Sequence, residues 1–262
     1  MALDKRRRSF KAGRQRGLIE WLASHGQKGT IADLCQAFGV SALTIRRDLA
    51  ELQDQGLVRV VRGGVFLSDG LAGFEVAFGV KAGEELEDKE RIARKAASLV
   101  RPGETILLDG GTTVGAMAKY LVGENVTVVT NALNVMETLS ASPSVRLIGI
   151  GGEFRQTSHA FLGPTANRML AELHVDQAFM GTESFAAGRG LEVPDWDDAE
   201  FKRSAVNAAA EVWVLATLSK YNRSRLHRFA TWERVTGLIT STGLADDDLA
   251  LFAAAEVEVV YV

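Results

Sequence analysis

Apolar residues at helical spacing mark the segment Ser41–Leu52. Ile45, Leu49 and Leu52 lie at positions i, i+4 and i+7, so one face of a predicted helix is apolar. Ser41 stands at the N-cap position, where its hydroxyl can accept a backbone N–H. The small, hydroxyl-bearing and cationic residues near the start of this helix lie largely off the apolar face: Ala42, Thr44, Arg46 and Arg47. A short helix with such side chains suits the major groove of DNA.

Two further helices are predicted before this segment, over Arg14–Ala23 and Ile31–Phe38. Gly39 ends the second of them at the usual C-terminal glycine position. A helix, a tight glycine turn and another helix form a helix-turn-helix arrangement. We therefore interpret the helix that follows Ser41 as a recognition helix.

A two-stranded hairpin is predicted next, with strands Leu57–Val61 and Val65–Leu67 joined at Arg62-Gly63-Gly64. Such a hairpin would be a wing, from which Arg59 and Arg62 can reach the sugar-phosphate backbone. An ordinary solvated turn residue is an equally good interpretation of Arg62. Residues 1–67 are thus predicted to form a winged helix-turn-helix DNA-binding domain, with these candidate contacts: Ser41, Ala42, Thr44, Arg46, Arg47, Arg59 and Arg62.

The hydrophobic pattern changes after a glycine-containing segment, residues 68–88, which we interpret as a linker. In residues 89–262, continuous apolar runs alternate with segments of helical composition. The runs are Thr105–Asp109, Val126–Thr130, Val145–Ile150, Gln177–Met180, Val212–Ala216, Thr236–Ile239 and Val257–Val262. This alternation predicts an α/β domain whose mostly parallel sheet is covered on both faces.

Four predicted strands are followed by loops rich in glycine, hydroxyl or cationic residues. Ligands bind at the carboxyl ends of parallel strands, and such loops suit an anionic or polyhydroxylated molecule. The candidate effector-binding residues are Asp109, Gly110, Gly111, Thr112, Thr113, Thr130, Asn131, Gly151, Gly152, Glu153 and Lys220. A single Gly-Gly turn is usually ordinary loop geometry, but four loops at matching strand ends favour a phosphorylated small molecule. Neither a P-loop nor the dinucleotide-binding glycine spacing is present.

Charge is distributed unevenly along the 262 residues, although the formal net charge is only −3. Residues 1–67 carry 12 basic and 6 acidic side chains, whereas residues 68–262 carry 18 and 27. A basic head on an acidic body is typical of a polyanion-binding module fused to another domain. The single cysteine, Cys35, excludes an internal disulfide and a cysteine-based zinc site, and it fits a cytoplasmic protein. We expect no membrane span and no secretory signal.

Longer motifs connect both halves with a known family. T-I-R-R-D-L-x-x-L-x-x-x-G-L-V followed by R-G-G-V resembles the N-terminal signature of DeoR-type bacterial transcriptional regulators. That family usually has H-G-G-A in the wing, so Arg62 and Val65 replace its His and Ala. The loops D-G-G-T-T, T-N, G-G-E and S-K resemble those of the family's effector domain, in the same order. Thr217 stands where the family commonly has Asp.

The resemblance implies an effector domain related to ribose-5-phosphate isomerase that binds a sugar phosphate. It also implies a regulator, usually a repressor, of sugar or related carbon metabolism that binds a double-stranded DNA operator. We expect a homodimer or homotetramer with no cofactor, no metal and no catalytic activity. Two alternatives stay open. One is a sugar-phosphate isomerase-like enzyme using Lys220 with Asp109 or Glu153 as acid and base. The other, favoured by Thr217, is a regulator that senses protein partners only.

Overall fold

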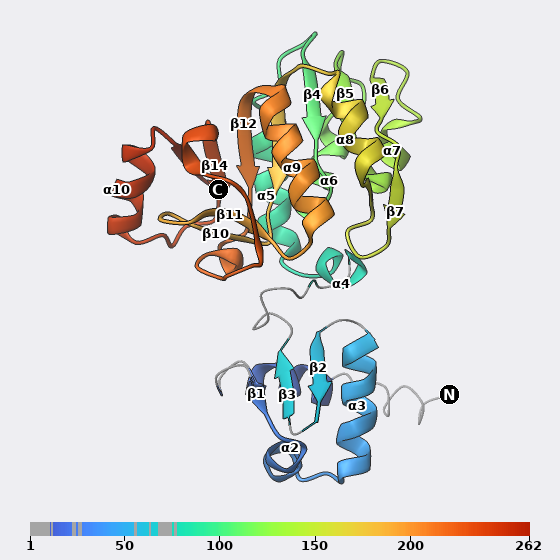
Figure 1. Ribbon diagram of the computed structural model, residues 1–262, viewed down its shortest axis with the longest axis vertical. Helices are drawn as coiled ribbons and strands as arrows, with labels where there is room; N and C mark the ends of the chain where they lie inside the picture. Colours follow the sequence, from blue (N-terminus) through green and yellow to red (C-terminus); the bar gives the residue numbers. More distant parts are fainter. Residues whose placement is uncertain are drawn as a thin grey trace. The chain divides into compact units, whose positions relative to one another are not determined.

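The computed structural model describes residues 11, 13–22, 25, 28–54, 57–62, 64–67, 75 and 78–262. Contacts divide the chain into two compact units, residues 1–77 and residues 78–262 (Figure 1). The basic N-terminal arm, Gly56, Gly63 and most of the expected linker lie outside the described residues. Among the residues described, no helix is both long and apolar enough to cross a membrane.

The N-terminal unit packs three helices against a small antiparallel sheet. Residues 13–22 are helical, followed by α2 (Ile31–Phe38) and α3 (Ala42–Asp54). The sheet order is β1 (Lys28–Gly29), β3 (Gly64–Leu67) and β2 (Val58–Val61). This arrangement confirms the predicted winged helix-turn-helix, while the short β1 was not predicted.

Apolar residues from the three helices and from β2 and β3 form one core: Leu18, Leu22, Leu34, Ile45, Leu49, Leu52, Val58, Val65 and Leu67. The ends of α2 follow the sequence signals. Thr30 and Asp33 form a capping box at its N-terminus, and Gly39 takes a φ of +63° at its C-terminus. Ser41 caps α3, because its Oγ accepts the backbone N–H of Thr44 at 3.3 Å.

A buried ion pair fixes α3 to the first helix. The Asp48 side chain is 2% exposed and accepts two hydrogen bonds from the Arg14 guanidinium, with Nε–Oδ2 at 2.5 Å and Nη2–Oδ1 at 3.2 Å. One turn later, Glu51 accepts from Lys11 and from Gln15. Bidentate pairing defines the geometry of both partners. The orientation of α3 therefore depends on a polar contact as well as on the apolar face predicted from sequence.

The C-terminal unit, called the sensor unit below, is built on a seven-stranded parallel sheet. Its order is β15 (Glu258–Tyr261), β14 (Gly237–Thr240), β12 (Ala209–Leu215), β9 (Val175–Gly181), β4 (Thr105–Leu108), β5 (Thr127–Thr130) and β6 (Arg146–Gly149). All six neighbouring pairs are parallel. Each predicted apolar run corresponds to one of these strands, which confirms the predicted fold class.

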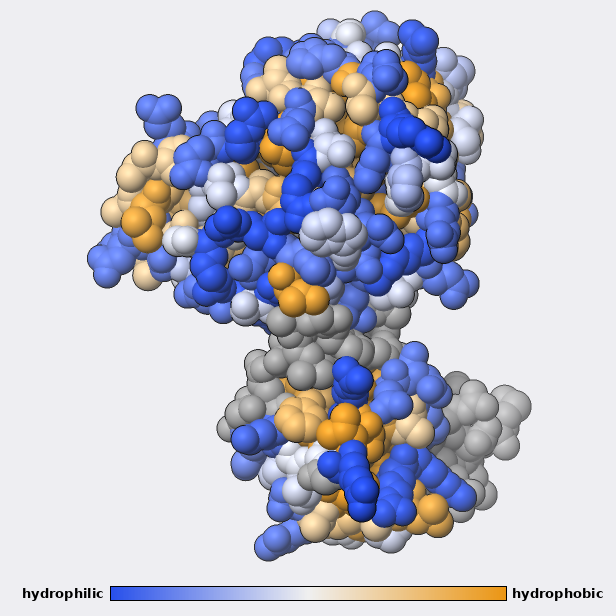
Figure 2. All heavy atoms as spheres, in the orientation of Figure 1, coloured by the Kyte–Doolittle hydropathy of each residue, from blue (hydrophilic) through white to orange (hydrophobic). Residues whose placement is uncertain are grey.

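Helices cover both faces of this sheet. Figure 1 shows α8 (Pro164–Ala171) and α9 (Trp196–Ala208) in front, with α5 (Leu86–Ala97) and α6 (Thr112–Gly115) behind. α7 (Leu133–Leu139) packs beside β6, and α10 (Asp246–Ala254) packs on β15. Successive strand residues alternate between the two cores: Leu107 joins the core with α8 and α9, whereas Ile106 and Leu108 join the core with α5. The visible surface is mainly hydrophilic, with small separated apolar patches (Figure 2).

Several elements were not predicted from the sequence. β7 (Glu153–Arg155) and β8 (Ala160–Leu162) form a hairpin. β10 (Ser184–Ala186), β11 (Gly190–Val193) and β13 (His227–Ala230) form a second sheet. Part of the expected linker is also folded, because α4 (Phe78–Ala82) and the start of α5 lie within residues 68–88. The sensor unit therefore begins before the expected residue 89.

Replacing Asp48 by Ala should destabilise the DNA-binding unit by about 1–3 kcal/mol, because Arg14 loses its buried partner. We expect faster amide hydrogen exchange across residues 31–54 of the full chain, measured by mass spectrometry. Asp54→Ala is the matched control, since Asp54 is exposed at the end of the same helix. Equal protection in the Asp48→Ala variant and the wild type would contradict this role.

Candidate functional site

The order of the strands places a binding edge between β4 and β9. The chain adds β5 and β6 on one side of β4, then returns to add β9, β12, β14 and β15 on the other side. Connections therefore leave the carboxyl ends of β4 and β9 in opposite directions. In open parallel sheets, this switch point is where ligands bind.

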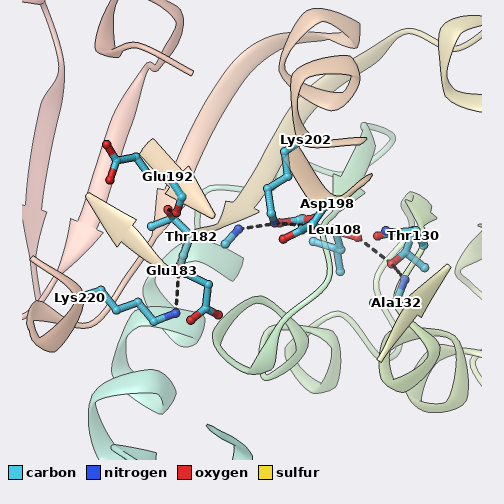
Figure 3. A network of polar contacts seen from close by, with 12 residues as sticks. Leu108, Thr130, Ala132, Thr182, Glu183, Glu192, Asp198, Lys202 and Lys220 are labelled. Carbon is cyan, nitrogen blue, oxygen red and sulfur yellow. Dashed lines mark hydrogen bonds and ion pairs between the residues drawn. The ribbon is translucent and has the colours of Figure 1, made fainter. Parts of the chain in front are cut away.

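Asp109 connects the two strands at this point. Its buried carboxylate follows β4 directly, and Oδ2 accepts the backbone N–H of Gly181 at 2.9 Å and a hydrogen bond from the Lys202 ammonium. The same ammonium lies 3.5 Å from Oδ1 of Asp198, one turn earlier on α9 (Figure 3). Asp109 Oδ1 has no hydrogen-bond partner among the described residues. Of the two carboxylate oxygens of this predicted effector contact, Oδ2 is thus already hydrogen-bonded within the protein.

Lys202 is a buried cation whose charge is held by its neighbours. Burial lowers the pKa of its ammonium, but Asp109 and Asp198 outweigh this effect and raise the pKa above its ordinary value. Lys202 therefore stays protonated at neutral pH. Buried ion pairs of this kind add little net stability, yet they are costly to break because one charge is left uncompensated.

Lys220 lies at the same edge, at the end of the short helix η3 (Leu218–Lys220) that follows β12. Its Nζ donates to the carbonyl oxygen of Thr182 at 2.6 Å (Figure 3). Burial lowers the pKa of Lys220 to about 8; the Glu183 carboxylate opposes the shift, and three neighbouring ammonium groups reinforce it, those of Lys81, Lys89 and Lys202. The charges of one carboxylate and three ammonium groups thus act on this side chain.

Glu183 is the carboxylate that faces this group of lysines. It follows β9 and pairs with Lys81 of α4, with Nζ–Oε1 at 2.8 Å. Burial raises the pKa of Glu183, but Lys81, Lys220 and Arg225 outweigh burial and bring the pKa to about 2. Glu183 is therefore ionised throughout the physiological range.

The loop after β5 contains two polar side chains, and they differ in how far their hydrogen-bonding groups are used. The Thr130 hydroxyl donates to the Leu108 carbonyl at 2.7 Å and accepts the Ala132 N–H at 3.0 Å. Thr130 therefore joins β5 to β4 and shapes the following turn. Asn131 donates through Nδ2 to the Phe161 carbonyl at 3.1 Å, and its buried Oδ1 has no partner in the described part of the chain.

The glycines after β4 are required by the backbone. A Cβ on Gly110 would lie 3.1 Å from the Ala160 Cβ, and Gly111 has a φ of +131°. Thr112 begins α6 and is half-buried, whereas Thr113 is buried with an Oγ1 that has no partner among the described residues. The predicted loop is thus tightly packed, and the buried Thr113 Oγ1 is a polar atom for which the described residues provide no partner.

The loop after β6 has a different role for each residue. A Cβ on Gly152 would lie 2.4 Å from the Leu162 carbonyl oxygen, at a φ of +154°, so this glycine permits the hairpin of β7 and β8. Glu153 is exposed and opens β7, while Gly151 is half-buried beside it. All the predicted effector residues follow strands of the same sheet edge. Whether they contact a ligand stays a prediction.

On the DNA-binding unit, α3 separates its buried and exposed residues as predicted. Ile45, Asp48, Leu49 and Leu52 are buried. Ser41, Ala42, Arg46 and Arg47 are exposed and Thr44 is half-buried, while Arg59 on β2 and Arg62 in the following turn are exposed. Their exposure is compatible with the predicted contacts to a DNA duplex, which stay a prediction.

Comparison with known proteins identifies both units. Residues 14–69 match the DeoR-like helix-turn-helix domain, and residues 84–242 match the DeoR C terminal sensor domain. The chain belongs to the DeoR family of transcriptional regulators. It therefore binds DNA through the helix-turn-helix and senses an effector through the α/β unit.

Full-length relatives agree with this assignment. The glycerol-3-phosphate regulon repressor of Escherichia coli is 30% identical over 87% of this chain and 89% of its own length. The lactose phosphotransferase system repressor of Streptococcus mutans is 31% identical over 85% of this chain and 89% of its own length. Both are named as repressors, so the enzyme alternative finds no support in them.

A solved structure of ribose 5-phosphate isomerase A from Methanocaldococcus jannaschii is also similar. It is 19% identical, covers 51% of this chain and 53% of its own, and has a TM-score of 0.38.

The sequence analysis did not predict the charged side chains that pair with one another at the sheet edge. Lys202 had one usable signal, because Asp198 and Lys202 are four residues apart on a helix face that also carries Phe201 and Ala205. A lysine on an apolar face needs a buried counter-charge. Glu183 and Lys81 gave no such signal, since their pairing joins segments 102 residues apart.

Replacing Lys202 by Met should destabilise the sensor unit by about 3 kcal/mol, because Asp109 and Asp198 would keep buried negative charge without a cation. Calorimetric unfolding of the full chain measures the loss. Adding Asp109→Asn should recover part of it, since one uncompensated charge is then removed. A double variant that is less stable than Lys202→Met would contradict the pairing.

Proposed function

We propose that this DeoR-family regulator represses genes of sugar or related carbon metabolism, and that a phosphorylated sugar sets its affinity for operator DNA. The effector would bind at the carboxyl edge of the parallel sheet. It would favour one of two arrangements of the protein, which requires different effector affinity in the two. The names of the two relatives, which refer to a glycerol-3-phosphate regulon and a lactose phosphotransferase system, support this proposal.

The position of Lys220 carries the proposal for the effector. It lies at the switch-point edge, where the charges of Glu183, Lys81, Lys89 and Lys202 act on its ammonium. A phosphate dianion would be attracted by the protonated Lys220 ammonium. Asn131 Oδ1, Thr113 Oγ1 and Asp109 Oδ1, all without partners in the described structure, supply acceptors for sugar hydroxyls along neighbouring strands. These residues and Lys220 are the effector contacts that we propose.

On the DNA side, we propose that Arg46 and Arg47 contact the duplex together with Ser41, Ala42 and Thr44, and that Arg59 and Arg62 contact phosphates from the wing. One recognition helix contacts only a few base pairs, so a homodimer or homotetramer on a two-fold symmetric operator would provide the affinity. We place this function in the cytoplasm, where DNA and metabolite meet.

Replacing both Arg46 and Arg47 by Ala should weaken operator binding at least tenfold, since each is expected to contribute about 1–3 kcal/mol through a base or phosphate contact. The operator is first selected from a random duplex pool with the wild-type protein, and affinity is then measured by gel retardation. Arg94→Ala with Arg101→Ala, exposed positions of the sensor unit, provides the same loss of charge. Unchanged retardation by the Arg46/Arg47 variant would overturn the proposed contacts.

Effector binding should weaken at alkaline pH, because Lys220 must be protonated to attract a phosphate. Sugar phosphates are dianionic above about pH 6, so their charge is constant from pH 7 upward. With the pKa of Lys220 at about 8, affinity should fall by about tenfold per pH unit above that value. Lys220→Arg should bind with a flat pH profile between pH 7 and 9.5, since a guanidinium stays protonated.

A thermal-shift screen with pentose and hexose phosphates identifies the ligand, because bound ligand raises the unfolding midpoint. The strongest binder is then titrated by calorimetry at each pH in both proteins. Identical pH profiles for the wild type and Lys220→Arg would exclude Lys220 as the titrating contact. Absence of any shift across the panel would count against a sugar phosphate effector.

A further inference from the structure

The turn between α4 and α5 places an unusual glutamate over the loop that contains Lys220. Glu85 has a φ of +49°, a left-handed conformation that is uncommon for residues other than glycine. It occupies the N-cap position of α5, but its side chain makes no cap hydrogen bond. Oε2 accepts instead from the Thr217 hydroxyl and from the Ser219 hydroxyl, both at 2.8 Å. The carboxylate is thus directed to a loop 132 residues away in sequence.

One more polar contact fastens the same segment to this edge, and another joins α5 to α4. Lys81 of α4 pairs with Glu183, and Lys89 of α5 is buried with its ammonium donating to the Lys81 carbonyl. Burial lowers the pKa of Lys89, while the Glu85 carboxylate opposes this shift and is therefore close to it. α4 and the start of α5 are thus held to the loop after β9 by one ion pair and to the loop after β12 by two hydroxyl hydrogen bonds.

The contact made by Glu85 is of the kind that a phosphate would make. Two hydroxyl donors, Thr217 and Ser219, lie beside each other at 3.1 Å and immediately precede Lys220. A phosphate oxygen accepts hydrogen bonds from hydroxyls as a carboxylate oxygen does, and it carries more negative charge. Both anions cannot occupy the same donors, since like charges at hydrogen-bonding distance repel strongly.

We propose that Glu85 is an internal competitor of the effector: its carboxylate occupies the hydroxyls of Thr217 and Ser219 until a phosphorylated ligand displaces it. This inference rests on the proposed function, because it assigns the regulation of the same site. Displacement of Glu85 releases the turn between α4 and α5. α4 begins at Phe78, the first residue of the sensor unit, so the released segment is the one that continues along the chain to the DNA-binding unit. Release of α4 thereby lowers affinity for the operator.

Glu85→Asn tests the competition in the full-length protein. Asparagine tolerates the left-handed conformation, so the turn is kept, but its side chain is shorter and uncharged. Inorganic phosphate is the probe, titrated by calorimetry at pH 7. Removing a competitor that makes two hydroxyl hydrogen bonds should tighten phosphate binding about three- to tenfold. Glu87→Asn is the matched control, because Glu87 is an exposed carboxylate in the first turn of α5.

The gain must come from the site that contains Lys220. Phosphate binding by the double variant Glu85→Asn, Lys220→Met should therefore lose the gain seen with Glu85→Asn alone. Hydrogen exchange gives a second readout, because amides of residues 78–89 should exchange faster in Glu85→Asn without phosphate and in the wild type with saturating phosphate. Protection of this segment by phosphate would overturn the proposal, as would phosphate binding by Glu85→Asn that is no tighter than in the wild type.

Operator binding separates this inference from the proposed function. On the DNA selected by the wild type, phosphate-free Glu85→Asn should bind about three- to tenfold more weakly than the wild type. This loss in DNA affinity should match the factor by which the substitution tightens phosphate binding. If the wild type binds both DNA and phosphate but Glu85→Asn changes neither, only the competition fails. If no phosphate binds to either protein, the effector site and the competition fail together.

Discussion

The contact between Asp109, Gly181 and Lys202 is the interaction on which the sensor unit depends most. The loops after β4 and β9 leave the sheet in opposite directions, and this carboxylate joins the two strand ends with a backbone hydrogen bond and an ion pair. Because Lys202 comes from α9, the same contact holds a covering helix to the sheet edge. The contact therefore ties β4, β9 and α9 together at the binding edge. In our proposal, the parts that respond to a ligand are the loop of Lys220 and the turn of Glu85.

Most of the fold could be predicted because its signals are local. Parallel strands covered on both faces consist of continuous apolar runs, so β4, β5 and β12 were visible in the sequence. The apolar stripe of α3 and the glycine at residue 39 defined the helix-turn-helix in the same way. The hairpin of β7 and β8 was missed because its strands are three residues long and β7 is mainly exposed. Such strands have no period that distinguishes them from loops.

The sequence predicted only the part of the candidate site that lies in loops directly after strands. Loops that follow strands can be assigned to one edge from the order of elements alone, which found Asp109, Asn131 and Lys220. The charges that control these loops come from distant segments: Lys202 reaches Asp109 over 93 residues, and Glu85 reaches Thr217 over 132. No spacing rule connects such pairs. Thr217 illustrates the difference, since the sequence shows that the family's carboxylate is absent there, and only the structure shows that Glu85 brings another carboxylate to the same loop.

The inward direction of Asp48 has an electrostatic consequence for the approach to a polyanion. Arg46, Arg47 and Asp48 are consecutive, and a formal count gives this triplet a single positive charge. Asp48 is buried and paired with Arg14, whereas both arginines face solvent, so Asp48 does not oppose their charge on the outer face of α3. Long-range attraction accelerates encounter with a charged partner and weakens as added salt screens it. Folding therefore gives this helix a stronger attraction for nucleic acid than its composition suggests.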